Sequence, residues 1–196
     1  MSEWWTYRLS DFLMFSPATY WRLVERYNRE VWPLQLLMLA AGLLLIWRTA
    51  VRPADRRILA VVLAAVWIWV GWAFHWRRYA PINWAAEYFA AVYALQAMLL
   101  LAAGLPRPAG NPGASTGIRE IGVALASIGV LVYPISGVLA GRPWSQAEVF
   151  GLMPEPTALA TLGLLLATGQ GRRGWLLLIP VLSLLVGIAT ASLVSR

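Results

Sequence analysis

Residues that could carry out chemistry gather around the only histidine of this 196-residue chain. His75, Arg77 and Arg78 follow a long apolar segment, and Asn83 and Glu87 open the next one. Histidine exchanges protons near neutral pH, and a carboxyl group at membrane depth requires a cation, a proton or water beside it. The spacing therefore predicts a site for ion handling or ligand binding where two apolar helices meet.

Glu87 is the residue on which this prediction depends most. We expect Asn83 to cap a helix, which places Glu87 about one turn inside it. In the alternative interpretation Glu87 is only a favourable charge near a helix N-terminus, paired with Arg77 or Arg78. If Glu87 is functional, it borders a cavity that opens towards the side of the chain termini. We expect residues of the second and fifth apolar segments in the same cavity.

The residues around His75 also have two interpretations. Charged and aromatic side chains collect at membrane interfaces, so His75, Arg77 and Arg78 can simply mark the end of a span. In the functional interpretation His75 handles a proton or binds a ligand, with Trp72 stacked one turn away.

Glu155 is a further candidate. It precedes Pro156, and an acid beside a proline is typical of a helix start, but it can equally belong to the predicted site. We expect Asn28, His75, Glu87 and Glu155 to lie at a similar depth, on the membrane side that carries both termini.

Composition excludes several kinds of site. The chain has no cysteine and a single histidine, which excludes disulfides, thiolate metal sites and multi-histidine metal sites within one chain. No paired acids and no serine–histidine constellation stand out, so we predict no catalytic residue and no metal ligand. No cofactor can be inferred from the residues.

Charge is confined to the ends of apolar segments. All sixteen basic residues are arginine, and the net charge is +7. Because the arginines flank apolar segments, they indicate topology and contact with lipid headgroups rather than nucleic-acid binding.

The elements that must position these residues are apolar helices. Six long segments carry no charge: 31–47, 58–74, 88–106, 121–141, 156–171 and 174–195. Each approaches the roughly 20 residues that cross a bilayer as a helix. The sequence predicts an all-α, polytopic membrane helical bundle with about six transmembrane helices, of which the fifth is the shortest. Residues 1–30 form an N-terminal interfacial segment, and residues 31–196 form the six-span domain.

An amphipathic helix is predicted before the first span. Ser16 and Pro17 are typical of a helix start. Tyr20, Val24 and Tyr27 then share one face, opposite charged residues. We expect this helix to lie on the membrane surface, and the alternative is docking onto a soluble partner.

Small residues recur at helical spacing in several spans. Such faces allow close approach of helices in lipid, either within the bundle or at an oligomer seam. The clearest examples are Gly122, Ala126 and Gly129 in the fourth span, and Ser183, Gly187 and Ala191 in the sixth.

The distribution of arginine residues predicts the orientation of the chain in the membrane. Six spans place eight arginines on each side, but the linkers alone are richer in arginine on the side away from the termini. Because arginine-rich linkers stay in the cytoplasm, we expect both termini outside it.

Several short motifs resemble those of a known family. They are residues 150–157 (FGLMPEPT) with Thr161-Leu162-Gly163, Tyr27-Asn28 followed by Trp32-Pro33, and Pro81-Ile82-Asn83. Together they resemble uncharacterised bacterial multi-spanning inner-membrane proteins of about 200 residues, the length of this chain. The resemblance implies a multi-pass protein of the bacterial inner (cytoplasmic) membrane, and it implies no activity.

Three functions are therefore compared. The first is a small-solute transporter or channel, favoured by polar residues at span ends. The second is an accessory or assembly subunit of a larger membrane complex. The third, a membrane-embedded lipid-modifying enzyme, lacks a catalytic motif. The expected partners are membrane lipids and either further copies of the chain or subunits of a membrane complex, with no nucleic acid.

Overall fold

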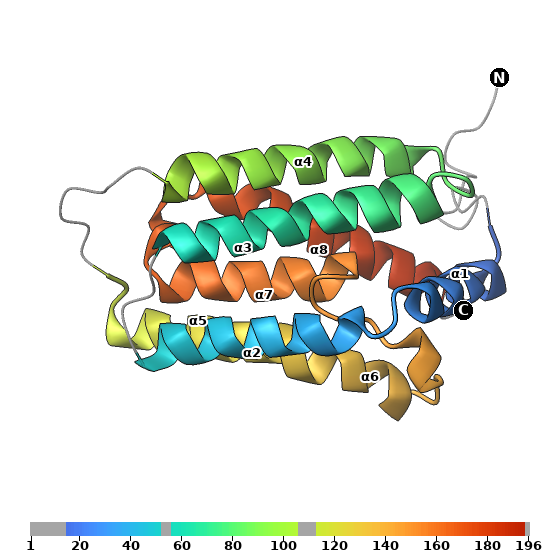
Figure 1. Ribbon diagram of the computed structural model, residues 1–196, viewed down its shortest axis with the longest axis horizontal. Coiled ribbons are helices and arrows are strands. Elements are labelled where there is room, and N and C mark those ends of the chain that lie inside the picture. Colours follow the sequence, from blue (N-terminus) through green and yellow to red (C-terminus); the bar gives the residue numbers. More distant parts are fainter. Residues whose placement is uncertain (1–14, 52–55, 106–112, 195–196) are drawn as a thin grey trace, which may run out of the picture.

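The computed structural model describes residues 15–51, 56–105 and 113–194, and residues 1–14 of the predicted interfacial segment lie outside them. The described residues form helices without strands (Figure 1), which confirms the all-α prediction for this part of the chain. In chain order the elements are α1 (Pro17–Glu30), α2 (Leu34–Val51), α3 (Arg56–Trp69) continued by the π-helix η3 (Val70–Tyr79), α4 (Ala85–Gly104), α5 (Thr116–Ser127) continued by the π-helical turn η4 (Ile128–Val132) and α6 (Tyr133–Leu139), the short turn η5 (Trp144–Gln146), α7 (Pro154–Ala167), the short turn η6 (Gln170–Arg172), and α8 (Trp175–Val194).

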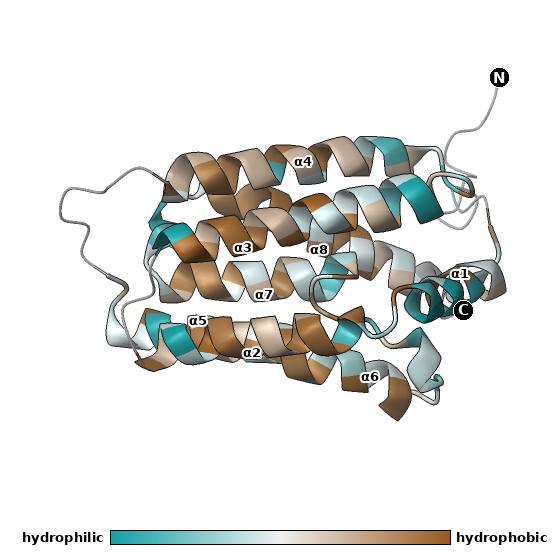
Figure 2. Cartoon of the chain, viewed as in Figure 1, coloured by the Kyte–Doolittle hydropathy of each residue, from teal (hydrophilic) through white to brown (hydrophobic). Residues whose placement is uncertain are grey.

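Five helices are long and apolar enough to cross a membrane. They are α2, α3 with η3, α4, α5 through α6, and α8. Figure 2 shows that their middle parts are apolar and that hydrophilic residues gather towards their ends. The described part of the chain therefore has the helix lengths and composition typical of a membrane protein. The remaining predicted crossing, the fifth, falls on α7, whose 14 residues are fewer than a full crossing needs.

α7 lies at the centre of the bundle. Ten of its 14 residues are buried, and it packs against α5, η4, α8, α2 and α3. It begins inside the bundle, short of the end at which α1 and the C-terminus lie (Figure 1). The core of the molecule is thus organised around a helix that extends through only part of it.

The loop before α7, residues 140–153, passes from the surface into the core, and we call it the inward loop. Phe150, Leu152 and Met153 at its end are fully buried. Backbone polar groups cannot be left unpaired in an apolar interior, and Thr157 meets this demand by accepting from the Gly151 amide at 2.8 Å and donating to the Met153 carbonyl at 2.7 Å. Gly151 has a φ of 79°, which glycine adopts without strain.

Small residues bring neighbouring helices into backbone contact. A Cβ at Gly163 would overlap the backbone of Gly122 and Ala126, and a Cβ at Gly129 would lie 2.7 Å from the Ala160 nitrogen. The helix formed by α3 and η3 approaches α4 equally closely, since Gly71 of η3 lies against Ala90 and Tyr93 of α4. The small-residue face of the fourth predicted span is therefore used within the bundle, the first of the two expected roles.

α1 starts as the sequence predicts. Ser16 caps it by accepting from the Thr19 amide at 3.2 Å, and Pro17 occupies the first turn. Tyr20, Val24 and Tyr27 are buried, and the opposite face is hydrophilic (Figure 2). This buried face packs against η3, η5 and α8 of the same chain, so it is not available to a soluble partner.

Candidate functional site

A cavity of about 270 Å³ lies beside the start of α7. Its walls come from α1, η3, α4, α7 and α8. Because α7 begins inside the bundle, it does not extend into the space before its first turn, and the cavity lies there. The lining residues are mostly aromatic and aliphatic: Tyr20, Phe74, His75, Tyr79, Phe89, Val92, Tyr93, Pro154, Glu155, Ile179, Leu182, Ser183, Val186, Gly187 and Thr190.

His75 is a buried polar residue of the cavity wall. It sits in the π-helix η3, a form that often marks functional positions, and only 5% of it is exposed. Its ring contacts Phe89 at 5.6 Å and Tyr93 at 4.6 Å between centroids. Neither ring nitrogen has a hydrogen-bond partner among the described residues. A buried polar group without a partner is costly, and a ligand in the cavity would relieve that cost.

Glu155 supplies a carboxyl group to the same cavity. It lies in the first turn of α7, where the helix dipole favours a negative charge. One carboxylate oxygen is buried and has no hydrogen-bond partner within the described part of the chain. Gly187 of α8 lies directly against the Glu155 side chain, so a Cβ there would have to displace the carboxyl group.

The cation nearest in sequence to Glu155 is already bound to another acid. Arg142 donates to Glu148 at 3.0 Å, and its guanidinium lies 3.8 Å from the centroid of the Trp21 ring. Among the residues that the structure describes, the side chains that line the cavity include one carboxyl group and no arginine. A carboxylate at Glu155 would therefore lack a cationic side chain beside it, and a positively charged ligand in the cavity would balance its charge.

One further polar pair crosses the cavity wall. The Tyr93 and Ser183 hydroxyl groups lie 2.6 Å apart and share a hydrogen bond between α4 and α8. Ser183 and Gly187 belong to the small-residue face predicted for the sixth span, and here that face forms part of the cavity.

The cavity reaches the outer surface of the bundle between α4 and α8. Val92, Leu182 and Val186 line it, yet each is between 39% and 48% exposed. The cavity therefore opens sideways, between two helices that are long and apolar enough to cross a membrane.

Glu87 does not take the place that we predicted. It is exposed in the first turn of α4 and does not line the cavity. Arg78 pairs with Glu30 instead, and Arg77 lies 5.6 Å from the centroid of the Trp72 ring. A cavity does lie between η3 and α7, but its acid is Glu155, and its residues from α7 are Pro154 and Glu155, which precede the predicted fifth segment 156–171. Glu87 has the environment of an ordinary charge near a helix start.

Asn28 and Asn83 support the backbone instead of lining the cavity. The Asn28 amide donates to the carbonyls of Ser145 and Ala147 at 2.9 Å each, which fastens the inward loop to α1. Asn83 accepts from the Ala85 amide at 3.0 Å at the start of α4, one residue before the cap position that the helix uses. Trp72 contacts Trp69 rather than His75.

Within the part of the chain that the structure describes, no three His, Asp or Glu side chains come together to hold a metal ion. The cavity chemistry is that of an apolar pocket with one carboxyl, one imidazole and a hydroxyl pair.

Comparison with protein families identifies the family of the chain. A family model of unknown function, DUF6064, matches residues 18–195. The chain belongs to this family. Comparisons with curated proteins and with solved structures found no match. The resemblance to an uncharacterised family of similar length is confirmed, and the family carries no activity to transfer.

Sequence reasoning identified His75 and Glu155 in this DUF6064 member but missed Tyr93, Ser183 and the aromatic wall. A tyrosine or serine inside an apolar segment is unremarkable in a sequence. The available signal was the spacing of Ser183 and Gly187, which we interpreted only as helix packing.

Proposed function

We propose that the protein is a membrane transporter for a small organic cation, with the cavity beside α7 as its binding site. The observation that supports this proposal is a buried carboxyl oxygen and two buried imidazole nitrogens beside one cavity, all without a hydrogen-bond partner among the described residues. An ammonium group of a suitable cation would donate to the carboxyl oxygen and to the imidazole nitrogen that carries no proton.

The walls of the cavity favour a cation with an apolar body. Phe74, Phe89 and Tyr93 present aromatic rings, and the faces of such rings attract cations. Glu155 provides the counter-charge, and His75 can accept a hydrogen bond from an ammonium group. A volume of about 270 Å³ lies at the lower end of ligand pockets, which suits a molecule smaller than a typical drug.

The position of the cavity favours transport over a purely structural role. Interrupted helices whose ends lie inside the bundle are typical of transporter binding sites, and α7 has this form. The small-residue faces that suggested a subunit role are used for contacts inside the chain. We further propose six crossings, with the inward loop and α7 together forming the fifth, and a location in the bacterial inner membrane.

The test uses benzylamine, a small aromatic ammonium ion, with benzyl alcohol and benzoate as neutral and anionic analogues. The purified chain in detergent should gain thermal stability with benzylamine only, because Glu155 must be neutralised. Proteoliposomes should take up radiolabelled benzylamine faster than empty liposomes.

A matched pair of variants isolates the site. Glu155→Gln should abolish both effects, whereas Glu87→Gln removes an equal charge from an exposed position and should leave both unchanged. Uptake equal to empty liposomes by the wild-type chain, or equal losses in the two variants, would refute the proposal.

A further inference from the structure

Four arginines border a groove at the end of the bundle where α1 meets η3. Arg22 and Arg26 come from α1, and Arg77 and Arg78 come from η3. Leu23, Glu30 and Pro81 complete the groove, whose volume is about 550 Å³. It is separate from the cavity beside α7, since the two have no lining residue in common.

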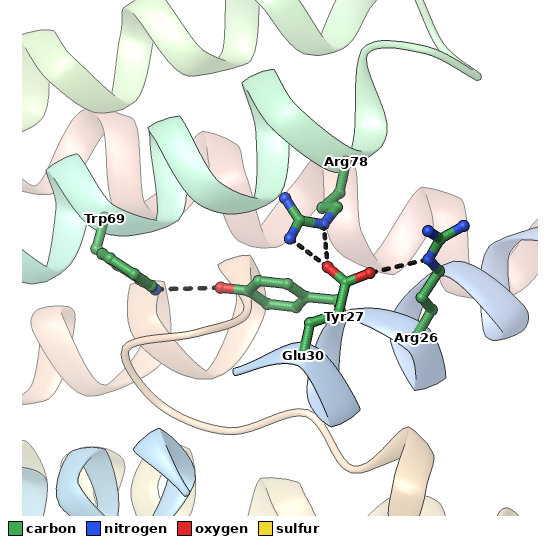
Figure 3. Close-up of polar contacts among 5 residues, drawn as sticks. All are labelled: Arg26, Tyr27, Glu30, Trp69 and Arg78. Carbon is green, nitrogen blue, oxygen red and sulfur yellow. Dashed lines mark hydrogen bonds and ion pairs between the residues drawn. The ribbon is translucent and has the colours of Figure 1, made fainter. Parts of the chain in front are cut away.

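One carboxylate holds two of these arginines. Arg26 donates to Glu30 through Nε at 2.9 Å, and Arg78 donates through Nε at 3.0 Å (Figure 3). Hydrogen bonds from Arg26 and Arg78 hold the pKa of Glu30 below its usual value, so the carboxylate stays ionised. Because Glu30 is the one acid of the groove, it leaves an excess of three positive charges there.

Aromatic residues fix the arginines of η3. The Arg78 guanidinium lies 5.7 Å from the centroid of the Tyr27 ring, and the Tyr27 hydroxyl accepts from Trp69 Nε1 at 3.1 Å (Figure 3). Arg77 lies 5.6 Å from the centroid of the Trp72 ring. The guanidinium groups of η3 are thus held in place before any ligand arrives, which lowers the entropic cost of binding.

The groove continues into a surface that suits lipid chains. Trp72, whose ring lies against Arg77 of the groove, is exposed, as are Trp76 beside Arg77 in the sequence and Trp84 at the start of α4, and exposed tryptophans are typical of the interface between water and membrane. Ile68 lies one turn before Trp72 and is also exposed, so an apolar strip extends from Arg77 along the spanning helix.

We propose that this groove binds the phosphate of an anionic phospholipid whose acyl chains lie along Ile68 and Trp72. Guanidinium groups match phosphate oxygens with two parallel hydrogen bonds, and clustered arginines near a membrane attract anionic lipids. The adjoining apolar strip favours a lipid over free phosphate. This inference does not depend on the transport proposal.

The test counts lipids bound to the full-length chain by native mass spectrometry, with phosphatidylglycerol compared with phosphatidylcholine. The wild-type chain should prefer phosphatidylglycerol. The Arg22→Gln/Arg77→Gln variant should lower this preference about 25-fold, since each arginine near an anionic surface contributes about fivefold. Neither arginine bonds Glu30, so the Arg26–Glu30–Arg78 cluster remains intact.

Matched variants distinguish a specific lipid site from a general effect of positive charge on the protein surface. Arg48→Gln/Arg172→Gln removes the same charge from exposed positions near the other end of the bundle and should keep the preference. The charge-conserving Arg22→Lys/Arg77→Lys variant should lose part of the preference at an unchanged melting temperature, because lysine keeps the charge but cannot form the paired hydrogen bonds. Equal losses in the Arg48/Arg172 pair, or full displacement of the lipid by millimolar inorganic phosphate, would overturn the proposal.

Discussion

The two sides of α7 differ in how the space beside them is filled. On the side of α5, Gly122, Ala126 and Gly163 allow the two backbones to touch. On the other side, towards η3, α4 and α8, the first turn of α7 borders a cavity that contains Glu155 and His75. One side is packed without gaps, and the other keeps polar groups without partners.

This contrast shows how a bundle can be both stable and functional. In lipid, helix association depends on close packing because the surrounding chains are as apolar as the helices. The α5–α7 contact provides such packing, so the bundle can tolerate a void elsewhere. The void costs stability, and unpaired polar groups add to that cost. Natural proteins accept costs of this kind at functional sites.

The largest effect is expected on the packed side. Gly163→Ala would place a Cβ against the Ala126 nitrogen and the Gly122 oxygen, which are backbone atoms and cannot move aside. We expect a loss of about 3 kcal/mol or more in the free energy of unfolding, at the upper end of overpacking effects. Thermal or denaturant unfolding in detergent measures it.

Gly117→Ala is the matched control, because a Cβ there meets nothing within 4 Å. It should leave stability unchanged or slightly raised, as alanine is the better helix former. A Gly163→Ala variant as stable as Gly117→Ala would show that the α5–α7 contact is looser than described.

An effect of opposite sign is expected on the cavity side. His75→Phe removes two unpaired nitrogens from a wall of aromatic rings and keeps a similar shape. The free energy of unfolding should rise by about 1–3 kcal/mol, the cost of a buried unpaired polar group. The stabilisation by benzylamine should be lost.

Trp84→Phe, a change at an exposed aromatic residue of the neighbouring turn, should alter neither quantity. If His75→Phe destabilised the protein while benzylamine still bound, the imidazole would be a structural group whose partners lie elsewhere.

The smallest effect on stability is expected from a glycine-to-alanine substitution in the wall of the cavity. In Gly187→Ala the new Cβ would meet only the side chain of Glu155, which can swing into the cavity. We expect a stability loss of about 1 kcal/mol or less, together with weaker benzylamine binding because the carboxylate is displaced. Comparing this variant with Gly163→Ala by unfolding and by ligand titration separates a rigid contact from an adjustable one. A loss as large as that of Gly163→Ala would contradict the contrast between the two sides.

The helices were predictable because spanning segments are long and uncharged. Each of the six predicted segments overlaps a helix of the structure. The start of α1 was predictable as well, since Ser16 and Pro17 act locally. The inward loop was not predicted to be buried, because hydropathy does not distinguish a short apolar run at the surface from one that enters the core.

The choice between Glu87 and Glu155 could not be made from sequence. Both acids lie in the first turn of an apolar helix, and both faces of such a helix are apolar in lipid. Periodicity therefore does not tell which face points inward. Only the packing of α8 against α7, with Gly187 beside Glu155, turns one of the two acids into the cavity.

The glycine contacts also have a mechanical consequence. α5 with α7, and α3 with α4, approach so closely that neither pair can slide without overlap between backbone atoms and their neighbours. Each helix pair therefore moves as a rigid unit. Both units line the cavity, through η3, α4 and α7, so a movement that widens or narrows the cavity must tilt one helix pair against the other. Among the described residues, such a movement is easiest at the small contact between α4 and α8.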